Sequence, residues 1–340
     1  MEKMRFGILG AARIAASALI PAIKKSSNAT VAAVAARDAA RAQTYAAEHG
    51  IPKSYGSYEA MLADPEIEAV YNPLPNSEHA PWAIKALEAG KHVLVEKSFT
   101  LNAAQAEQVA AAAAKAGRMV MEAFMYRFHP QIGQAQEIIK RGDIGELRLI
   151  RPSFSFFLSR PADIRWVTKL GGGALYDIGT YCVNVSRTFA GREPLQVLGV
   201  AELTGESDPG GGGADHTFVG LLEFGEGLRS SFDCSFRQTF RQRVELVGSE
   251  GSLTILEPFV PNRNSKGQDQ GHGSSVPNLI VNGETVPTVA ADQYQLMVEH
   301  FVRAARGEEA LRYPVEEAVR QMHVLDALFL SAREDRSVRL

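Results

Sequence analysis

The first 125 residues alternate between short apolar stretches and longer amphipathic or alanine-rich stretches, and this alternation constrains the fold more than any other feature of the sequence. Asp38 and Asn102 are placed to cap predicted helices, and Gly50 and Gly90 are placed to end them. The predicted strands are 5–9, 30–36, 68–71, 92–95 and 119–123, and the predicted helices are 14–25, 39–48, 78–89 and about 102–117. Repeated strand–helix–strand units with short connections favour a parallel sheet covered by helices on both faces.

The pattern changes after about residue 125. One predicted helix is followed by strand-like stretches that succeed one another without helices, which favours an antiparallel or mixed sheet. The helix is 132–140, the strands are 146–158, 196–203, 216–224, 228–236, 243–247 and 252–256, two closing helices are 293–306 and 315–333, and 210–213 and 262–275 are connecting loops, the first of them flexible. We therefore expect an α/β Rossmann domain over residues 1–124. An α+β domain with a mostly antiparallel open sheet is expected over residues 125–340, for substrate binding and oligomerisation.

The composition excludes several classes of protein. A chain of 340 residues is long enough for two domains, and a net charge of −3 gives no field that would attract nucleic acid or an anionic membrane. No apolar stretch reaches about 18 residues and the apolar start is too short for a signal peptide, so we expect a cytoplasmic protein. Cys182 and Cys234 are too few for a disulfide framework and are expected to be buried. The eight histidines show no metal-ligand spacing, so no metal is expected.

A turn of small residues follows the first predicted strand. Gly10, Ala12 and Ala15 occupy the positions of the three glycines in a dinucleotide-binding fingerprint, where small residues let backbone N–H groups approach a pyrophosphate. A tight turn without a ligand is the alternative. Because the turn lies at the first strand–helix junction, we assign Gly10, Ala12, Arg13 and Ile14 to a cofactor site.

The end of the second predicted strand indicates which dinucleotide binds. NAD-binding folds usually carry an acid there that takes both ribose hydroxyls, whereas this chain has Arg37. A guanidinium is suited to a 2′-phosphate, and Arg13 supplies a second cation near it. NADP is therefore the expected cofactor, with NAD as the alternative.

Glu96 and Lys97 follow the buried strand that begins at His92. Both are expected at the carboxyl edge of the sheet, where ligands bind in open α/β folds. A lysine beside a cofactor can polarise a hydroxyl group or lower the pKa of a neighbouring phenol. A surface ion pair at a strand end is the alternative.

Six stretches occur in matching order along nearly the whole chain: Gly10–Ala15, Tyr71–Asn76, Glu78-His79, Ala89–Lys97, Glu122–Pro130 and Gly171–Tyr181. Together they resemble the glucose–fructose oxidoreductase/inositol dehydrogenase (Gfo/Idh/MocA) family. The resemblance is closest to the branch that contains NADP-dependent D-xylose dehydrogenases and dimeric dihydrodiol dehydrogenases. One position departs from the family pattern, since Glu-Lys-Pro reads Glu96-Lys97-Ser98 here.

The resemblance implies that Lys97 is catalytic near the nicotinamide and that Glu96 contacts the nicotinamide ribose. It also implies a catalytic residue on the helix after the triple glycine, where this sequence has Tyr181, and Asp177 lies four residues earlier on the same helix face. A phenol ordinarily titrates near pH 10, so it needs a cation such as Lys97 to act at neutral pH. We expect Tyr181 to remove the substrate hydroxyl proton as hydride leaves for nicotinamide C4, with Asp177 orienting the sugar or the lysine. An ordinary core aromatic is the alternative for Tyr181.

Further cofactor contacts are expected along the first domain. His79, in the first turn of a helix capped by Asn76, is a candidate contact to the nicotinamide, with a surface histidine as the alternative. Leu74 and Asn76 belong to the matching stretch before it and are assigned to the cofactor site. Arg165, just before the triple glycine, is also assigned to that site.

Three residues are candidates for substrate binding. Arg127 and His129 lie at the crossover between the domains, where a substrate cleft is expected, with a hinge role as the alternative. Trp166 precedes the triple glycine and is a candidate to close over the substrate, with a core position as the alternative.

These observations favour an NADP-preferring oxidoreductase that transfers hydride between the nicotinamide and a small sugar or vicinal diol. An open sheet face needs cover, so a homodimer or higher homo-oligomer is expected. One alternative is a reductase of nucleotide-linked keto sugars, for which Arg237, Arg241 and Arg243 are candidate extra cations. The other is a non-catalytic NADP-binding regulator, against which the joint presence of Lys97 and Tyr181 argues.

Overall fold

The computed structural model describes residues 2–206, 208, 210–261 and 278–340, so the predicted loop 262–275 lies outside the described residues. The chain forms two compact units, Met1–Met125 with Gln293–Met322, and Tyr126–Asp292 with His323–Leu340. The sequence-based division assigns everything after residue 124 to one domain, whereas helix α8 (Gln293–Ala305) joins the first unit. The reason is apolar packing: α8 contacts α1 (Ile20–Lys25) and β2 (Ala29–Ala35), and its Phe301 ring lies 5.8 Å from that of Phe6.

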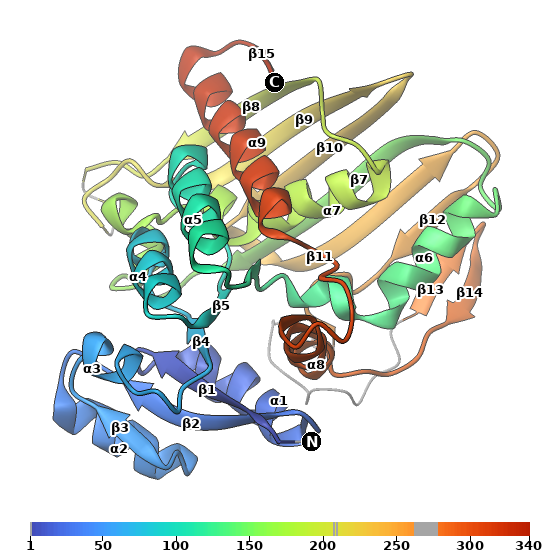
Figure 1. Ribbon diagram of the computed structural model, residues 1–340. Helices are drawn as coiled ribbons and strands as arrows, with labels where there is room; N and C mark the ends of the chain where they lie inside the picture. The colour runs from blue at the N-terminus through green and yellow to red at the C-terminus, as the bar shows by residue number, and fades with distance from the viewer. Residues whose placement is uncertain (1, 207, 209, 262–277) are drawn as a thin grey trace. The chain divides into compact units, whose positions relative to one another are not determined.

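The first unit contains a six-stranded sheet in which every strand is parallel, in the order β3-β2-β1-β4-β5-β6 (Figure 1). This confirms the predicted Rossmann-type sheet, whose order reverses between β1 and β4. Its strands are β1 (Met4–Leu9), β2, β3 (Lys53–Tyr55), β4 (Ala69–Asn72), β5 (His92–Val95) and β6 (Val120–Glu122). Its helices are α1, which a π-helical turn (Ala15–Leu19) precedes, α2 (Ala39–His49), α3 (Tyr58–Leu62), α4 (Asn76–Glu88) and α5 (Ala103–Ala116), besides α8.

Two of the predicted helix caps are confirmed and one is wrong. The Asp38 side chain accepts a hydrogen bond from the Arg41 amide (2.9 Å), and the Asn102 side chain accepts one from the Gln105 amide (2.9 Å). Asn76 is instead the first residue of α4, and Pro75 occupies the cap position.

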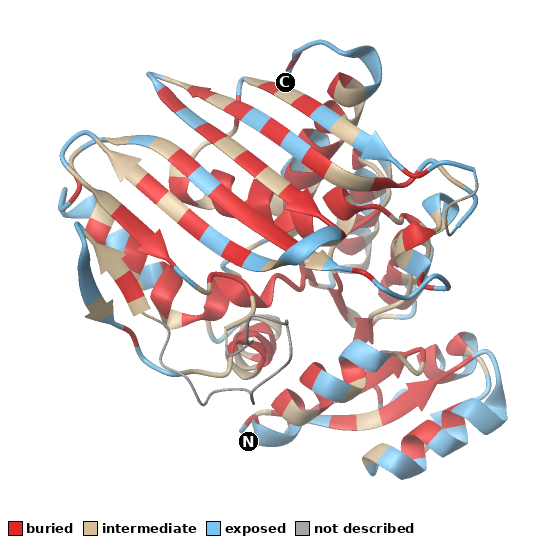
Figure 2. Cartoon of the chain, turned by 180° about the vertical axis from the view of Figure 1, so that it is seen from behind, coloured by how far each residue is buried: buried red, intermediate tan, exposed pale blue. Residues whose placement is uncertain are grey.

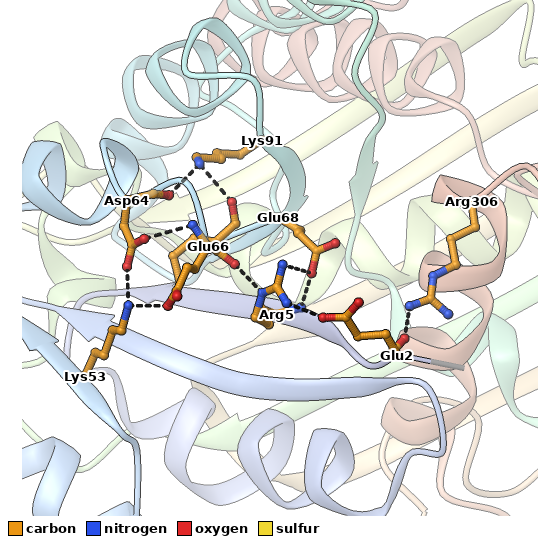
Figure 3. Close-up of polar contacts among 9 residues, drawn as sticks. Glu2, Arg5, Lys53, Asp64, Glu66, Glu68, Lys91 and Arg306 are labelled. Atoms are coloured by element: carbon orange, nitrogen blue, oxygen red, sulfur yellow. Dashed lines mark hydrogen bonds and ion pairs between the residues drawn. The ribbon is translucent and has the colours of Figure 1, made fainter.

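Charged side chains gather at the amino-terminal edge of the first sheet (Figure 3). Arg5, near the start of β1, contacts the carboxylate of Glu68, and Lys53, at the start of β3, lies 2.9 Å from Asp64 Oδ2. Lys91, just before β5, donates to the Asp64 and Ile67 carbonyls at 2.7 and 2.8 Å. Ligands bind at the opposite, carboxyl edge of such sheets, so this network lies away from the candidate site.

The described residues of the second unit form a nine-stranded sheet in the order β14-β13-β12-β11-β7-β10-β9-β8-β15. Among these strands only β7 and β10 pair in parallel, which confirms the predicted, mostly antiparallel sheet. The strands are β7 (Leu147–Phe157), β8 (Gln196–Leu203), β9 (Asp215–Gly225), β10 (Leu228–Ser235), β11 (Arg237–Gly248), β12 (Ser252–Ile255), β13 (Asn278–Val281), β14 (Glu284–Pro287) and β15 (Val338–Arg339). Strand β11 begins six residues earlier than predicted, because its polar first half pairs with β7 across a register shift between Arg237 and Arg241.

Helices cover one face of this second sheet. They are α6 (Pro130–Lys140), α7 (Thr180–Ala190) and the C-terminal part of α9 (Val315–Glu334). On the opposite face the strands alternate between buried and accessible residues (Figure 2), and Val200, Val219 and Leu221 are exposed there. The open sheet is therefore confirmed. Among the described residues, no helix has the length and apolar character needed to cross a membrane.

Candidate active site

The turn after β1 lies at the point where the order of the first sheet reverses. Gly10 has φ +83°, and a Cβ on it would lie 2.9 Å from Leu74 Cδ2 on the loop after β4. Its amide donates to the Ala35 carbonyl at 2.7 Å. Only glycine combines this backbone conformation with so close an approach, so the fingerprint position fits a turn that brings backbone against a ligand.

Side chains of α2 hold the same turn from its other side. The Arg41 guanidinium donates to the Ala11 carbonyl at 3.2 Å, and the Tyr45 hydroxyl donates to the Ala12 carbonyl at 2.9 Å. Burial raises the pKa of Tyr45 to about 12, so its hydroxyl stays protonated as a donor. Neither residue was predicted from the sequence.

Arginines gather around this turn. Arg13 and Arg41 both line a shallow surface pocket beside Ala11, and Arg37 is exposed at the end of β2. Burial raises the pKa of the Tyr58 phenol. The positive charges of Arg37 and Arg41 both lower that pKa, so the two guanidinium groups act on the same phenol. The sequence does indicate that Arg41 has a role. It lies in the first turn of α2, where a positive charge is unfavourable with respect to the helix dipole, so helix stability does not explain its position.

Glu96 and Lys97 lie at the carboxyl end of β5, as predicted. The Tyr71 hydroxyl donates to Glu96 Oε1 at 2.5 Å, and the Lys97 amide donates to Glu96 Oε2 at 3.3 Å. The Glu96 carboxylate is buried, whereas Lys97 is half-buried. The peptide bond between Lys97 and Ser98 is cis.

His79 joins the loops after β4 and β5. Its Nδ1 lies 2.7 Å from the Ser98 carbonyl oxygen and its Nε2 lies 2.7 Å from the Leu74 carbonyl oxygen. Burial lowers the pKa of His79 to about 4. The structure thus places this imidazole in the interior, between the loops that carry Leu74 and Lys97, and a direct contact with the cofactor stays a prediction.

In the second unit, Asp177 pairs with Arg165. Arg165 Nε lies 2.6 Å from Asp177 Oδ2, and Arg165 Nη1 lies 3.2 Å from Asp163 Oδ1. The Asp177 charge is the main cause that raises the pKa of Arg165. Asp177 belongs to a π-helical turn (Leu175–Gly179) that continues into α7, and such turns occur frequently at functional sites. The sequence patterns assigned both residues to the site without indicating that they pair.

Tyr181, in the first turn of α7, lies in a cluster of aromatic rings. Its ring centroid is 5.9 Å from that of Tyr126, 5.6 Å from Phe154 and 5.3 Å from Phe259. The Tyr126 hydroxyl donates to Asn184 Oδ1 at 2.6 Å, one turn further along α7. Tyr181 is 5% exposed, so its ring is held by packing on several sides.

The predicted substrate-binding residues are all buried. Arg127 lies in a 3₁₀ turn (Met125–Phe128), and His129 caps α6, where Nδ1 accepts a hydrogen bond from the Gln131 amide at 3.3 Å. Trp166 packs edge-on against Phe236 at 5.6 Å and donates from Nε1 to the Arg160 carbonyl at 2.9 Å. Contact of these three side chains with substrate stays a prediction.

The loop at 210–213 packs against another segment of the second unit, in addition to connecting β8 with β9. All four glycines have positive φ, and a Cβ on Gly210 would lie 2.0 Å from the Trp166 carbonyl oxygen. The Thr168 hydroxyl donates to the Gly212 carbonyl at 3.1 Å. The loop therefore lies against the segment that carries Arg165.

Replacing His129 by asparagine is expected to reduce the acid sensitivity of the fold. Burial lowers the pKa of His129 to about 4. On acidification the imidazole is therefore protonated at a higher pH in the unfolded chain than in the folded one. The free energy of unfolding falls as pH decreases from about 6.5 toward 4. Asparagine keeps a capping oxygen without a titrating ring. At pH 7 we expect an unchanged melting temperature. At pH 5 the variant gains up to roughly 2 kcal/mol relative to wild type.

Thermal unfolding at both pH values checks this, with the exposed His323→Asn as the matched control. Equal acid sensitivity of wild type and His129→Asn would contradict it.

The three arginines considered for a nucleotide-linked substrate have partners within the second unit. Arg237 pairs with Asp208 at 3.1 Å, Arg241 pairs with Asp233, and Arg243 donates to the Thr254 hydroxyl at 3.3 Å. Among the described residues, no group of three or more histidines, cysteines or acids is arranged to hold a metal ion. Cys182 and Cys234 are free and buried, as expected.

A parallel nucleotide-type sheet joined to an open antiparallel sheet, with an acid–lysine pair at the carboxyl end of β5, defines a dinucleotide-dependent oxidoreductase. Residues 4–124 match the model of the oxidoreductase family with an NAD-binding Rossmann fold (GFO_IDH_MocA), and residues 132–254 match the GFO/IDH/MocA C-terminal domain. The chain therefore belongs to the Gfo/Idh/MocA family, as the sequence resemblance predicted.

Relatives match almost the full chain. An uncharacterized oxidoreductase of Rhizobium meliloti is 38% identical over 98% of both chains. The D-xylose 1-dehydrogenase (NADP(+)) 2 of Haloferax volcanii is 37% identical over 99% of this chain and 100% of the relative.

The fold is shared with KijD10, a 3-ketoreductase from Actinomadura kijaniata solved in complex with NADP and TDP-benzene. It has a TM-score of 0.89 and 30% identity and covers 97% of this chain and 98% of that one. KijD10 variants with one tyrosine changed to phenylalanine, or one lysine changed to alanine or glutamate, were also solved with NADP and TDP-benzene.

Proposed function

We propose that the protein is an NADP-preferring dehydrogenase or reductase acting on a CH–OH group of a free sugar or vicinal diol. The observation that carries the proposal is the position of Glu96 and Lys97 at the carboxyl end of β5, since ligands bind at that edge of such sheets. The relationship to an NADP-dependent D-xylose dehydrogenase along the whole chain supports this substrate class.

The first unit fits a dinucleotide phosphate. At Gly10 a Cβ would fill the space between the turns after β1 and β4, and without it the backbone can approach a pyrophosphate. Arg13, Arg37 and Arg41 provide cations for a 2′-phosphate, and the acid that follows Arg37, Asp38, caps α2. When bound, NADP supplies nicotinamide C4 as the hydride acceptor.

The chain supplies the proton chemistry. We assign to the Tyr181 hydroxyl the role of base toward the substrate hydroxyl, with the Lys97 ammonium favouring the ionised phenol. Asp177, fixed through its pair with Arg165, then orients the hydroxyl of the sugar. In the reductive direction the Tyr181 hydroxyl returns the proton.

Replacing Arg37 and Arg41 by alanine together is expected to raise the KM for NADP by about 100-fold or more and to raise the KM for NAD far less, through the lost bond from Arg41 to the Ala11 carbonyl alone. Each guanidinium loses a charge-assisted bond to the 2′-phosphate, a group that NAD lacks. Initial rates with both cofactors check this, and Arg141→Ala, an exposed arginine of the second unit, is the control. An equal change for NADP and NAD would contradict the assignment.

The function itself is tested by following NADPH absorbance with a panel of aldoses, ketoses and vicinal diols. Turnover of a free sugar or diol supports the proposal. Turnover confined to a nucleotide-linked keto sugar would favour the alternative reductase activity, and cofactor binding without turnover of any substrate would favour a regulator.

We also propose that a second copy of the chain covers the open face of the second sheet. That face combines exposed Val200, Val219 and Leu221 with charge pairs of both signs, such as Arg151–Glu245 and Arg241–Asp233, which suits a self-complementary contact. If the protein sediments only as a monomer at micromolar concentration, this proposal is contradicted.

A further inference from the structure

We propose that Asp215 is a positioning residue, which fixes the helical segment that carries Asp177 and Tyr181. It is the first residue of β9 and is buried. Its Oδ2 accepts a hydrogen bond of 2.6 Å from the amide of Leu175, where the π-helical turn begins. The inference rests on the proposed roles of Asp177 and Tyr181.

The second carboxylate oxygen of Asp215 explains why one position of the triple glycine has no side chain. A Cβ on Gly173 would lie 2.0 Å from Asp215 Oδ1, and the residue has φ +123°. A Cβ on Gly172 would lie 2.5 Å from the Arg165 carbonyl oxygen, which also accepts a hydrogen bond from the Gly173 amide at 2.9 Å. The entry to the helix is therefore packed between Asp215 and the backbone of Arg165.

An acid is suited to this place. The first N–H groups of a helix have no partner within the helix, and a negative charge near them is favourable. Burial raises the pKa of Asp215 to about 7, and its bonds from the amides of Leu175 and Ala174 act in the opposite direction. The short bond from the Leu175 amide therefore gives this buried carboxylate a partner that solvent does not supply.

The anchored segment leads directly to the site. The Asp177 amide donates to the Gly173 carbonyl at 3.1 Å, so the first turn that Asp215 fixes contains Asp177. The Asp177 carboxylate in turn pairs with Arg165, and Tyr181 follows one turn later. Without the carboxylate this end of the helix is free to shift, and a displacement of about 1 Å at a reacting group costs on the order of 100-fold in rate.

The test compares Asp215→Asn with wild type in kcat, in KM for NADP and in thermal unfolding. The amide keeps one accepting oxygen but turns an NH2 group toward the second N–H donor. We expect kcat to fall by roughly 10- to 100-fold while KM for NADP changes far less, because all the proposed cofactor residues except Arg165 belong to the first unit. Asp143→Asn, an exposed acid of the second unit, is the control and is expected to change neither constant.

The same substitution in a Tyr181→Phe background separates positioning from a general structural effect. A residue that acts through Tyr181 adds little further loss there, whereas an equal loss in both backgrounds would overturn the inference. If Tyr181→Phe abolishes turnover and Asp215→Asn does not change it, the inference fails alone. If Tyr181→Phe leaves turnover unchanged, the proposed function fails.

Should Asp215→Asn not fold, Asp215→Ser keeps a smaller acceptor for the same comparison. Failure of both variants to fold would assign Asp215 to folding and overturn the inference.

Discussion

Replacing Tyr181 by phenylalanine is expected to lower turnover by about 100- to 10,000-fold. The substitution removes only the hydroxyl that exchanges a proton with the substrate. The ring keeps its contacts with Tyr126, Phe154 and Phe259, so the packing around it is preserved. NADPH binding is expected to stay unchanged, because all the proposed cofactor residues except Arg165 belong to the first unit and the substitution leaves the ion pair of Arg165 with Asp177 in place.

Single-turnover absorbance and NADPH fluorescence titration measure the two effects separately. Tyr126→Phe is the matched control, because it also removes a hydroxyl from this aromatic cluster. The Tyr126 hydroxyl donates to Asn184 and has no proposed part in proton transfer. For this control we expect a loss of at most about tenfold, the value of one hydrogen bond. Unchanged turnover in Tyr181→Phe would remove the proposed base from the mechanism.

Replacing Lys97 by methionine is expected to lower turnover at neutral pH by about 100-fold or more and to move the rate profile toward alkaline pH. A phenol without a nearby cation titrates near pH 10, so activity is expected to recover as pH rises toward that value. Methionine keeps an unbranched apolar stem on the half-buried side chain. The loss of packing is therefore small.

Initial rates from pH 6 to 10 at saturating NADP check the second prediction, within the stable range of each variant. Lys97→Arg is the matched variant, because it keeps the charge with a different donor geometry and is expected to keep the pH profile while lowering the maximum. A uniform loss at every pH in Lys97→Met would show that Lys97 holds the substrate without acting on the phenol.

Local features of the fold could be predicted from the sequence. The strand–helix alternation, the caps at Asp38 and Asn102 and the position of Lys97 after β5 depend on neighbouring residues only. They were therefore readable from spacing and residue type.

Features that depend on distant residues could not be predicted. The return of α8 to the first unit depends on Phe6 meeting Phe301, and the length of β11 depends on a partner strand, β7, some 80 residues away. His79 shows the same limit. Its two ring nitrogens meet carbonyls that only the folded loops bring together.

In the candidate site, residue type was readable but pairing was not. Arg165 and Asp177 were each assigned to it, and their ion pair follows from a turn whose geometry depends on Gly172 and Gly173. The role of Arg41 as a donor to the Ala11 carbonyl could not be predicted, because it requires α2 to lie beside the first turn.

The return of α8 has a consequence for how this protein can be divided or recombined. The chain passes from one unit to the other three times, near residues 125, 292 and 322, so neither unit is a continuous piece of sequence. A single crossover with another member of the family near residue 124 would exchange one sheet but leave Phe6 facing a foreign helix in place of Phe301. Chimeras that graft a new cofactor preference must therefore carry two separate segments, 1–125 and 293–322, from the same parent.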